Sequence, residues 1–249
     1  MMIPILMYHQ IAAMPAKGTP YRGLSVPPEK FRAQMRWLKR LGYQGLSMRD
    51  LEPYLRGEKR GRVFGITFDD GYANVLENAL PVLQECGFTS TTYFVAGHAP
   101  GHNYWDHEKG VPRSELMSIS QIERWRDGGQ EIGSHTLDHV HLAQLPIEQA
   151  EHQIKESKRI LEALYQVPVT AFCYPYGDCN EAVFALTQKA GYTNATTIER
   201  GLVLPTDDLY RLPRVTIAGS LDLFSFFMKV LTKKEHRHRL KKQANDGVY

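Results

Sequence analysis

The sequence predicts an α/β protein whose parallel strands close into a barrel, and three observations lead to this prediction. Short apolar runs alternate with amphipathic segments along most of the 249 residues. Such alternation indicates βαβ units and a parallel sheet. The length suits a single (β/α) barrel, whereas GxGxxG, typical of the open doubly wound alternative, follows none of the expected strands.

The expected elements follow from apolar runs and from residues that start or stop helices. Eight strands are expected, at residues 5–8, 43–46, 63–68, 88–95, 131–134, 169–174, 192–197 and 212–217. Six helices are expected, at residues 28–41, 48–55, 74–86, 120–126, 146–165 and 181–190. We expect Pro81 to kink the third helix, Pro146 to be the first residue of the fifth, and Ser118 or Ser120 to cap the fourth. Residues 97–117 match neither pattern and predict a long loop near the site.

The C-terminal segment differs from the rest, which predicts a barrel domain at 1–220 and an amphipathic helix with a basic tail at 221–249. An apolar stretch, LDLFSFFMKVL, runs into KKEHRHRLKK. From Lys229 onward the net charge is +5, which leaves −2 for the preceding residues out of a total of +3. An apolar stripe beside a basic run is typical of a helix lying on anionic lipid. A last helix packed on the barrel with a solvated end is the other interpretation, and the favoured one.

Composition narrows the functional classes. No apolar run approaches the roughly 18 residues of a membrane span, and the start, MMIPILMYHQI, lacks the features of a signal peptide. The expected location is therefore the cytoplasm, or the inner face of the membrane if the tail contacts lipid. The residues before Lys229 carry a small net negative charge, which does not suit nucleic acid as a partner. Disulfide frameworks and zinc-thiolate sites do not fit the three cysteines, Cys86, Cys173 and Cys179.

Three polar clusters follow expected strands, at the strand ends where parallel α/β folds build active sites. The first, TFDDG, contains Asp69 and Asp70, which could bind a metal and activate a water or simply form a turn. The second, SHTLDH, contains His135 and His139, whose spacing brings two imidazoles within reach of one ion unless they belong to an exposed loop. The third, YPYG at 174–177, is a rigid turn that could point an N–H at an oxyanion, or an ordinary strand-to-helix turn.

The aromatic residues near these clusters suit a sugar. Tyr174 and Pro175 could form a wall against a sugar ring. In the motif NYWD, Trp105 could stack on a sugar or anchor a loop, and Asp106 could bind a hydroxyl or fix that loop. The absence of a P-loop and of GxSxG disfavours phosphate-cradling and nucleophilic-serine enzymes.

TFDDG, SHTLDHVHL and YPYG, in this order, resemble the motifs of the polysaccharide deacetylases of carbohydrate esterase family four. The resemblance extends over nearly the whole chain, from ILMYH to RLPRVTI. It implies a distorted (β/α) barrel of seven to eight parallel strands and removal of N-acetyl groups from amino sugars with a divalent metal. Zn²⁺ is the favoured ion, with Co²⁺, Mn²⁺ and Ni²⁺ as alternatives because a His₂Asp site accepts several first-row metals.

The resemblance also implies a role for each matching residue. Asp69 matches the general base of the family. Asp70, His135 and His139 match its metal ligands. Tyr176 matches the residue whose backbone N–H helps to hold the oxyanion.

Three departures from the family pattern stand out. Cys173 occupies the place of an arginine that orients the base, an Asp-Trp motif is not visible, and a C-terminal Leu-x-His is missing. The pattern resembles a circularly permuted branch, typified by poly-N-acetylglucosamine deacetylases, in which the acid histidine follows an N-terminal strand. His9 in LMYH fits that place. Arg214 is a candidate to supply the missing guanidinium near Asp69 and to lie among the substrate-binding residues.

The expected function is metal-dependent hydrolysis of N-acetyl groups on an amino sugar of a poly- or oligosaccharide, including a lipid-linked one. An N-acetylated saccharide is accordingly the expected partner. Two alternatives stay open. One is a deformylase or other deacylase of a nucleotide- or lipid-linked sugar. The other is a catalytically impaired carbohydrate-binding barrel, which Cys173 and the missing Asp-Trp motif suggest.

Overall fold

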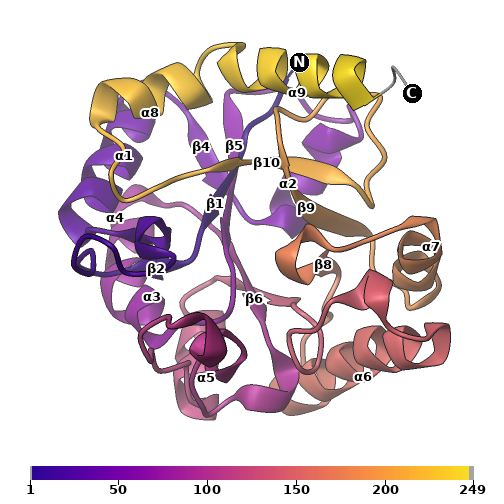
Figure 1. The fold of residues 1–249 in the computed structure, drawn as a ribbon. Coiled ribbons are helices and arrows are strands. Elements are labelled where there is room, and N and C mark those ends of the chain that lie inside the picture. The colour runs from indigo at the N-terminus through magenta and orange to yellow at the C-terminus, as the bar shows by residue number, and fades with distance from the viewer. Residues whose placement is uncertain (1, 247–249) are drawn as a thin grey trace.

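Seven parallel strands close into a barrel in the computed structural model, which describes residues 2–246 and side chains as far as Lys241 (Figure 1). Around the barrel the strands are β1 (Ile5–Tyr8), β10 (Leu212–Thr216), β9 (Asn194–Arg200), β8 (Ala171–Cys173), β7 (Glu131–Ser134), β6 (Thr91–Phe94) and β5 (Val63–Phe68). An eighth strand, β4 (Gln44–Leu46), pairs with the first half of β5. The predicted distorted barrel of seven to eight parallel strands is confirmed, and the open-sheet alternative is wrong.

Closure of the barrel depends on the N-terminal strand. β1 pairs with β10 on one edge and with β5 on the other, with Leu6 opposite Val215 and Ile66 respectively. The first and last strands are therefore neighbours, as a circular permutation requires. All four residues of β1 and all six of β5 are buried. Strands that are covered on both faces have nearly continuous apolar sequences, which is why these two strands could be predicted from apolar runs.

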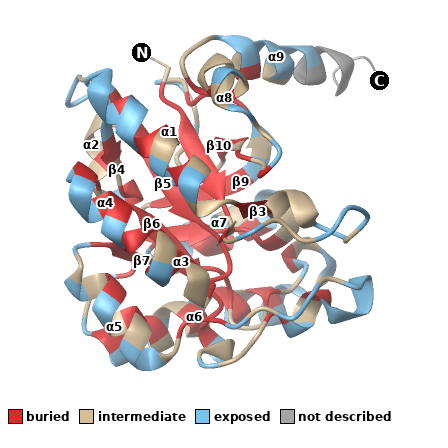
Figure 2. Cartoon of the chain, turned by 90° about the vertical axis from the view of Figure 1, so that its left-hand side faces the viewer, coloured by how far each residue is buried: buried red, intermediate tan, exposed pale blue. Residues whose placement is uncertain are grey.

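The helices surround the barrel, with exposed residues on their outer faces and buried ones toward the strands (Figure 2). They are α1 (Pro28–Arg40), α2 (Met48–Leu55), α3 (Ala73–Asn78), α4 (Leu80–Cys86), α5 (Ile119–Asp127), α6 (Ile147–Tyr165), α7 (Glu181–Lys189), α8 (Leu223–Val230) and α9 (Lys234–Asp246). Large aromatic side chains such as Phe31, Phe68 and Trp125 fill the space between α1, α5 and the strands.

Most predicted boundaries agree with the structure to within a few residues, and the differences have local causes. The expected third helix is two helices, α3 and α4, divided at Ala79 just before Pro81, because proline lacks the N–H that a continuous helix needs. Pro146 is the N-cap of α6 and not its first residue, with an extended ψ of 144°. Ser118 caps α5 in a capping box with Gln121.

Two irregular segments flank the mouth of the barrel. Residues 97–117, predicted as a long loop, contain the end of η2 (Ala96–His98) and the 3₁₀ turns of η3 (Tyr104–Lys109). The N-terminal segment forms a small second sheet, in which β2 (Gln10–Ile11) pairs with β3 (Ser25–Val26). These two segments supply walls to the site described below.

The C-terminal segment packs on the barrel as far as its side chains are described. Phe226 of α8 is fully buried. Glu235 of α9 is also fully buried and accepts hydrogen bonds of 3.0 and 3.1 Å from the guanidinium of Arg200. Arg239 donates to Asp207 at 2.7 Å, whereas Phe224 is 74% exposed. Contact of this segment with lipid stays a prediction, as does its division from the barrel. Within residues 2–246, no helix combines the length and the apolar character needed to cross a membrane.

Candidate active site

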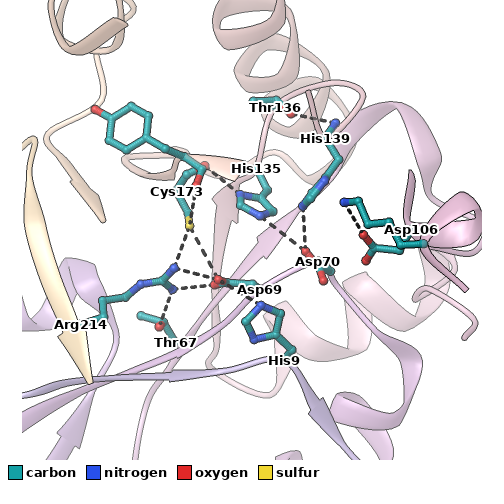
Figure 3. Close-up of polar contacts among 12 residues, drawn as sticks. His9, Thr67, Asp69, Asp70, Asp106, His135, Thr136, His139, Cys173 and Arg214 are labelled. Carbon is teal, nitrogen blue, oxygen red and sulfur yellow. Dashed lines mark hydrogen bonds and ion pairs between the residues drawn. The ribbon is translucent and has the colours of Figure 1, made fainter. Parts of the chain in front are cut away.

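Polar side chains from distant parts of the chain meet at the carboxyl ends of the strands (Figure 3). His9 follows β1, Asp69 and Asp70 follow β5, and His135 follows β7. They border a cavity of about 340 Å³, whose walls are His9, Tyr21, Leu24, Asp69, Asp70, Asp106, His135, His139, Tyr174, Tyr176 and Ile198. All residues predicted from the three motifs as base or metal ligands are thus in one place.

Asp70 and two histidines form a compact set of metal donors. Asp70 Oδ1 lies 3.5 Å from His135 Nε2 and 3.3 Å from His139 Nε2. Tetrahedral bonds of about 2.1 Å would place ligand atoms about 3.4 Å apart. The three residues therefore fit one divalent ion, and three protein ligands leave a further coordination position open.

Neighbouring groups fix the orientation of the two imidazoles. His135 Nδ1 donates to the carbonyl of Cys173 at 2.8 Å, which directs Nε2 toward Asp70. A second partner of this kind sets the tautomer and the direction of a ligating histidine. For His139, the backbone N–H donates to Thr136 Oγ1 at 2.9 Å, which fixes the main chain, and the ring stacks on Trp105. The metal set is therefore held in place by the protein itself.

The backbone at this set adopts strained conformations. Asp70 has φ 72°, Thr136 φ 67° and His139 φ 53°, all in the left-handed region. Each such residue costs about 1–3 kcal/mol and persists where the surroundings demand it, which is common at functional sites. Burial by itself raises the pKa of the Asp70 carboxyl, but hydrogen bonds from His135 and His139 outweigh it and hold that pKa well below its usual range.

Asp69 has a separate partner, Arg214. The guanidinium Nη1 lies 2.6 Å from Asp69 Oδ1, and Nη2 lies 2.8 Å from Oδ2. Arg214 is fully buried, and its remaining donors reach Thr67 Oγ1 and the carbonyl of Thr197. The expected proximity to Asp69 is confirmed. A direct contact between Arg214 and substrate is wrong, because the side chain lies beneath Asp69 and does not line the cavity.

Arg214 also determines the charge state of Asp69. Burial alone raises the pKa of the Asp69 carboxyl. The guanidinium and the neighbouring imidazole of His9 lower it more, so the pKa lies below its usual value. A bidentate pair of this kind fixes the plane of the carboxylate as well as its charge.

His9 lies on the other side of Asp69 from His135 (Figure 3). Its Nε2 is 3.8 Å from Asp69 Oδ2, and its side chain is 16% exposed toward the cavity. An imidazole here can reach a group held between it and the metal donors. His9 thus borders the cavity beside Asp69, and its role as the acid stays a prediction.

Cys173 explains how Arg214 fits. Its Sγ lies 3.1 Å from Arg214 Nη2 and 3.8 Å from Asp69 Oδ2. A small side chain on β8 leaves room for a long one that crosses from β10. Cys173, Asp69 and His135 also bring donor atoms close together, but Arg214 already engages both Asp69 oxygens, which leaves Asp70 as the better carboxylate ligand.

Both tyrosines of the YPYG turn border the cavity. Tyr174 is fully buried, and its hydroxyl donates to the carbonyl of Tyr210 at 3.1 Å. Pro175 is buried as well. Tyr176, with φ 58°, faces the cavity and stacks on His141 with ring centroids 4.0 Å apart. Tyr174 borders the cavity, so its contact with a sugar stays a prediction. The predicted contact of Pro175 is wrong, because Pro175 is buried and does not line the cavity.

Trp105 and Asp106 reach the site through η3. The Trp105 ring stacks on His139, with centroids 4.6 Å apart at 17°, so it anchors that histidine and does not line the cavity. Asp106 is 6% exposed, lines the cavity and pairs with Lys109 at 3.0 Å. Of the two roles predicted for Trp105, stacking on a sugar and anchoring, the structure favours anchoring. Asp106 is placed for both of its predicted roles, binding a sugar hydroxyl and fixing the loop.

Sequence reasoning missed three cavity walls. Tyr21, Leu24 and Ile198 belong to no motif. Tyr21 is 48% exposed and Ile198 is 49% exposed. An aromatic residue in a loop rich in Gly and Pro is a weak signal that could have singled out Tyr21, whereas nothing in the sequence singles out Ile198.

Comparison with known proteins agrees with this geometry. The family model of polysaccharide deacetylases matches residues 56–195, more than half of the chain. The chain belongs to the polysaccharide deacetylase family. Members of this family are hydrolases of N-acetyl amide bonds in sugars, and this chain is accordingly an enzyme of that class.

Individual relatives cover most of the chain. YxkH of Bacillus subtilis (strain 168), which its name assigns to the polysaccharide deacetylases, is 30% identical over 226 residues, 90% of this chain and 74% of that protein. The poly-β-1,6-N-acetyl-D-glucosamine N-deacetylase of Staphylococcus epidermidis is 28% identical over 218 residues, 84% of this chain and 72% of that protein. Among solved structures, the polysaccharide deacetylase BC0361 of Bacillus cereus has a TM-score of 0.78 at 29% identity, over 92% of this chain and 69% of that one. The Streptococcus pyogenes deacetylase PplD in complex with acetate shares the fold, with a TM-score of 0.80 at 24% identity over 92% and 98% of the two chains.

Proposed function

We propose that this chain removes acetyl groups from N-acetylglucosamine residues of an oligo- or polysaccharide, with a divalent ion held by Asp70, His135 and His139. The observation that carries the proposal is the division of labour between adjacent carboxylates. Asp70 lies at ligand spacing from two imidazoles, whereas Asp69 next to it is held by Arg214. The relative named as a poly-β-1,6-N-acetyl-D-glucosamine N-deacetylase supports the choice of sugar. Zn²⁺ is the favoured ion, with Co²⁺, Mn²⁺ and Ni²⁺ as alternatives.

The residues around the cavity account for the proton transfers. When bound, the ion supplies a Lewis acid for the acetamide carbonyl and lowers the pKa of water. Asp69 accepts the proton of the attacking water as its oxygen adds to the carbonyl carbon. The backbone N–H of Tyr176 donates to the resulting oxyanion. As the C–N bond breaks, His9 donates a proton to the sugar nitrogen, which leaves acetate and a free amine.

The alternative of a catalytically impaired barrel depended on Cys173 in place of an arginine and on the missing Asp-Trp motif. The pairing of Arg214 with Asp69 removes the first reason, because it supplies a guanidinium from another strand. The deformylase alternative differs only in the acyl group, so an assay that separates acetate from formate distinguishes the two.

The first prediction concerns metal removal. We expect the protein loaded with one Zn²⁺ per chain to release acetate from oligomers of N-acetylglucosamine, to lose this activity on chelation and to regain it when Zn²⁺ is added back. Replacing His139 with Ala should remove one ligand and abolish stoichiometric binding, measured by elemental analysis. His152→Ala, on α6 and outside the cavity walls, is the matched control.

Two results would count against this proposal. One is acetate release that persists after complete chelation. The other is a His139→Ala protein that still holds one ion per chain. Release of formate from N-formylated sugars at a much higher rate than acetate would favour the deformylase alternative.

The second prediction tests the role of His9. An acid is needed for an amine leaving group but not for a phenolate, which leaves without protonation. We expect His9→Ala to lower turnover of an N-acetylated sugar by about 10²–10⁴-fold and to lower hydrolysis of 4-nitrophenyl acetate far less. An equal loss on both substrates would show that His9 acts on something other than the leaving group.

A further inference from the structure

The two histidines of the candidate metal set differ in how their rings are held. His135 donates a hydrogen bond of 2.8 Å from Nδ1 to the carbonyl of Cys173. His139 directs Nε2 at Asp70 (Figure 3), but its Nδ1 is buried and has no hydrogen-bond partner among the described side chains and backbone. Hydrogen bonding of Nδ1 therefore does not orient the ring of His139, and other contacts must do so.

Aromatic rings enclose the imidazole of His139 instead. The Trp105 ring lies nearly parallel to it, with centroids 4.6 Å apart and 17° between the planes. The Tyr176 ring meets it edge-on, with centroids 4.6 Å apart at 82°. Stacked and edge-to-face arrangements are those that aromatic pairs prefer, and each pair is worth about 0.5–1.5 kcal/mol beyond its burial. Turning the plane of the imidazole would break the parallel stack on Trp105.

One short segment, η3, determines both of these ring contacts. Trp105 belongs to η3. Lys109, at the end of η3, places Nζ 4.1 Å from the centre of the Tyr176 ring and 3.0 Å from Asp106 Oδ1. A cation over an aromatic face is attracted by the charge distribution of the ring. The position of η3 therefore sets the stacked contact of His139 directly and its edge-on contact through Lys109.

Hydrogen bonds attach the loop that contains η3 to the residue that precedes His139. The Tyr104 hydroxyl donates to the backbone carbonyl of Asp138 at 3.1 Å. Earlier in the loop, His98 Nε2 lies 3.0 Å from Asp138 Oδ1, and the His98 ring packs on Tyr104 with centroids 4.3 Å apart. The segment that carries Trp105 is thus tied to the backbone next to His139.

We propose that Trp105 is a positioning residue for His139, which keeps the divalent ion bound by preventing the imidazole from turning away from Asp70. This inference rests on the proposed function, which assigns the ion to Asp70, His135 and His139. Losing the second partner of a ligating histidine typically costs about 10–100-fold in metal affinity. Here a stacked ring takes the place of the usual hydrogen bond, so the ion leaves faster when that ring is missing.

The test compares two replacements of Trp105 that differ in the presence of a flat ring. Trp105→Phe keeps a ring that can stack on His139, whereas Trp105→Leu keeps an apolar side chain without one. Trp37→Leu, on α1 and 42% exposed, is the matched control for the loss of an indole. Competition of the Zn²⁺-loaded full chain with a chromogenic chelator gives the Kd and the rate of Zn²⁺ release. The visible absorption spectrum of the Co²⁺-loaded protein reports the ligand geometry.

We expect Trp105→Leu to bind Zn²⁺ about 10–100-fold more weakly, to release it faster and to change the Co²⁺ spectrum. Trp105→Phe should retain most of the affinity, and Trp37→Leu should bind Zn²⁺ as the unsubstituted protein does. Tyr104→Phe removes only the hydroxyl that binds Asp138, so it should raise the rate of release by a smaller factor. Near-UV circular dichroism of the metal-free proteins checks that each is folded.

Three results would overturn the inference. The first is a Kd and a Co²⁺ spectrum that are the same in Trp105→Leu as in the unsubstituted protein. The second is an equal loss of affinity in Trp105→Phe and Trp105→Leu, which would show that the stacked ring is not what matters. The third is a higher KM for N-acetylglucosamine oligomers with an unchanged Kd for Zn²⁺, which would assign Trp105 to the sugar. An unsubstituted protein that binds no Zn²⁺ would instead contradict the proposed function, and this inference with it.

Discussion

Replacing Asp69 with Asn is expected to lower turnover of an N-acetylated sugar by about 10²–10⁴-fold while one metal ion stays bound per chain. The amide cannot accept the proton of the attacking water, whereas the donors at ligand spacing belong to Asp70, His135 and His139. Turnover is measured by acetate release, and metal content by elemental analysis of the same samples.

Asp70→Asn is the matched comparison, because it changes the neighbouring carboxylate in the same way. It should reduce metal affinity, since a neutral amide replaces the charged ligand of the set. If Asp69→Asn instead loses the ion and Asp70→Asn keeps it, the assignment of roles to the two carboxylates is wrong. Near-UV circular dichroism checks that both variants are folded, because Asp69→Asn leaves the buried Arg214 without its negative partner.

Replacing Arg214 with Met is expected to lower the free energy of unfolding by about 3–5 kcal/mol, the usual range for breaking a buried ion pair, and to lower turnover as well. Methionine fills much of the same space but leaves the Asp69 carboxylate, 2% exposed, without its two hydrogen bonds. Unfolding is followed in denaturant and turnover by acetate release. The stability and turnover of Arg214→Lys should lie between those of Arg214→Met and of the unsubstituted protein, because lysine keeps the charge and loses the bidentate geometry.

The double variant Asp69→Asn/Arg214→Met distinguishes the stabilisation that comes from the ion pair from the stabilisation that comes from the other contacts of Arg214. Removing both charges leaves no unpaired ion, so the double variant should be less destabilised than the sum of the two single ones. Strict additivity would show that Arg214 stabilises the barrel through Thr67 and Thr197 and not through Asp69. Near-normal turnover in Arg214→Met would contradict its role in orienting the base.

Most of the candidate catalytic residues were predicted from the spacing of residues close together in the sequence. Asp69 and Asp70 are adjacent, His135 and His139 are four residues apart, and each pair follows a strand. Strands that are parallel end at the same edge of the barrel, so residues after different strands meet there whatever their separation in sequence. The metal donors and the base could therefore be predicted without knowing how the strands pair.

By itself, then, the sequence determined the kind of fold and the family and predicted the metal set and the base, because these depend on residue type, spacing and the period of apolar runs. Only the tertiary structure decided that β1 bridges β10 and β5, that Arg214 reaches Asp69 across 145 residues, and that Tyr176 stacks on His141 at the cavity wall. The physical reason is that closure and side-chain direction depend on contacts between distant segments. A strand's own residues do not specify which neighbour leaves room for a guanidinium, as Cys173 does here.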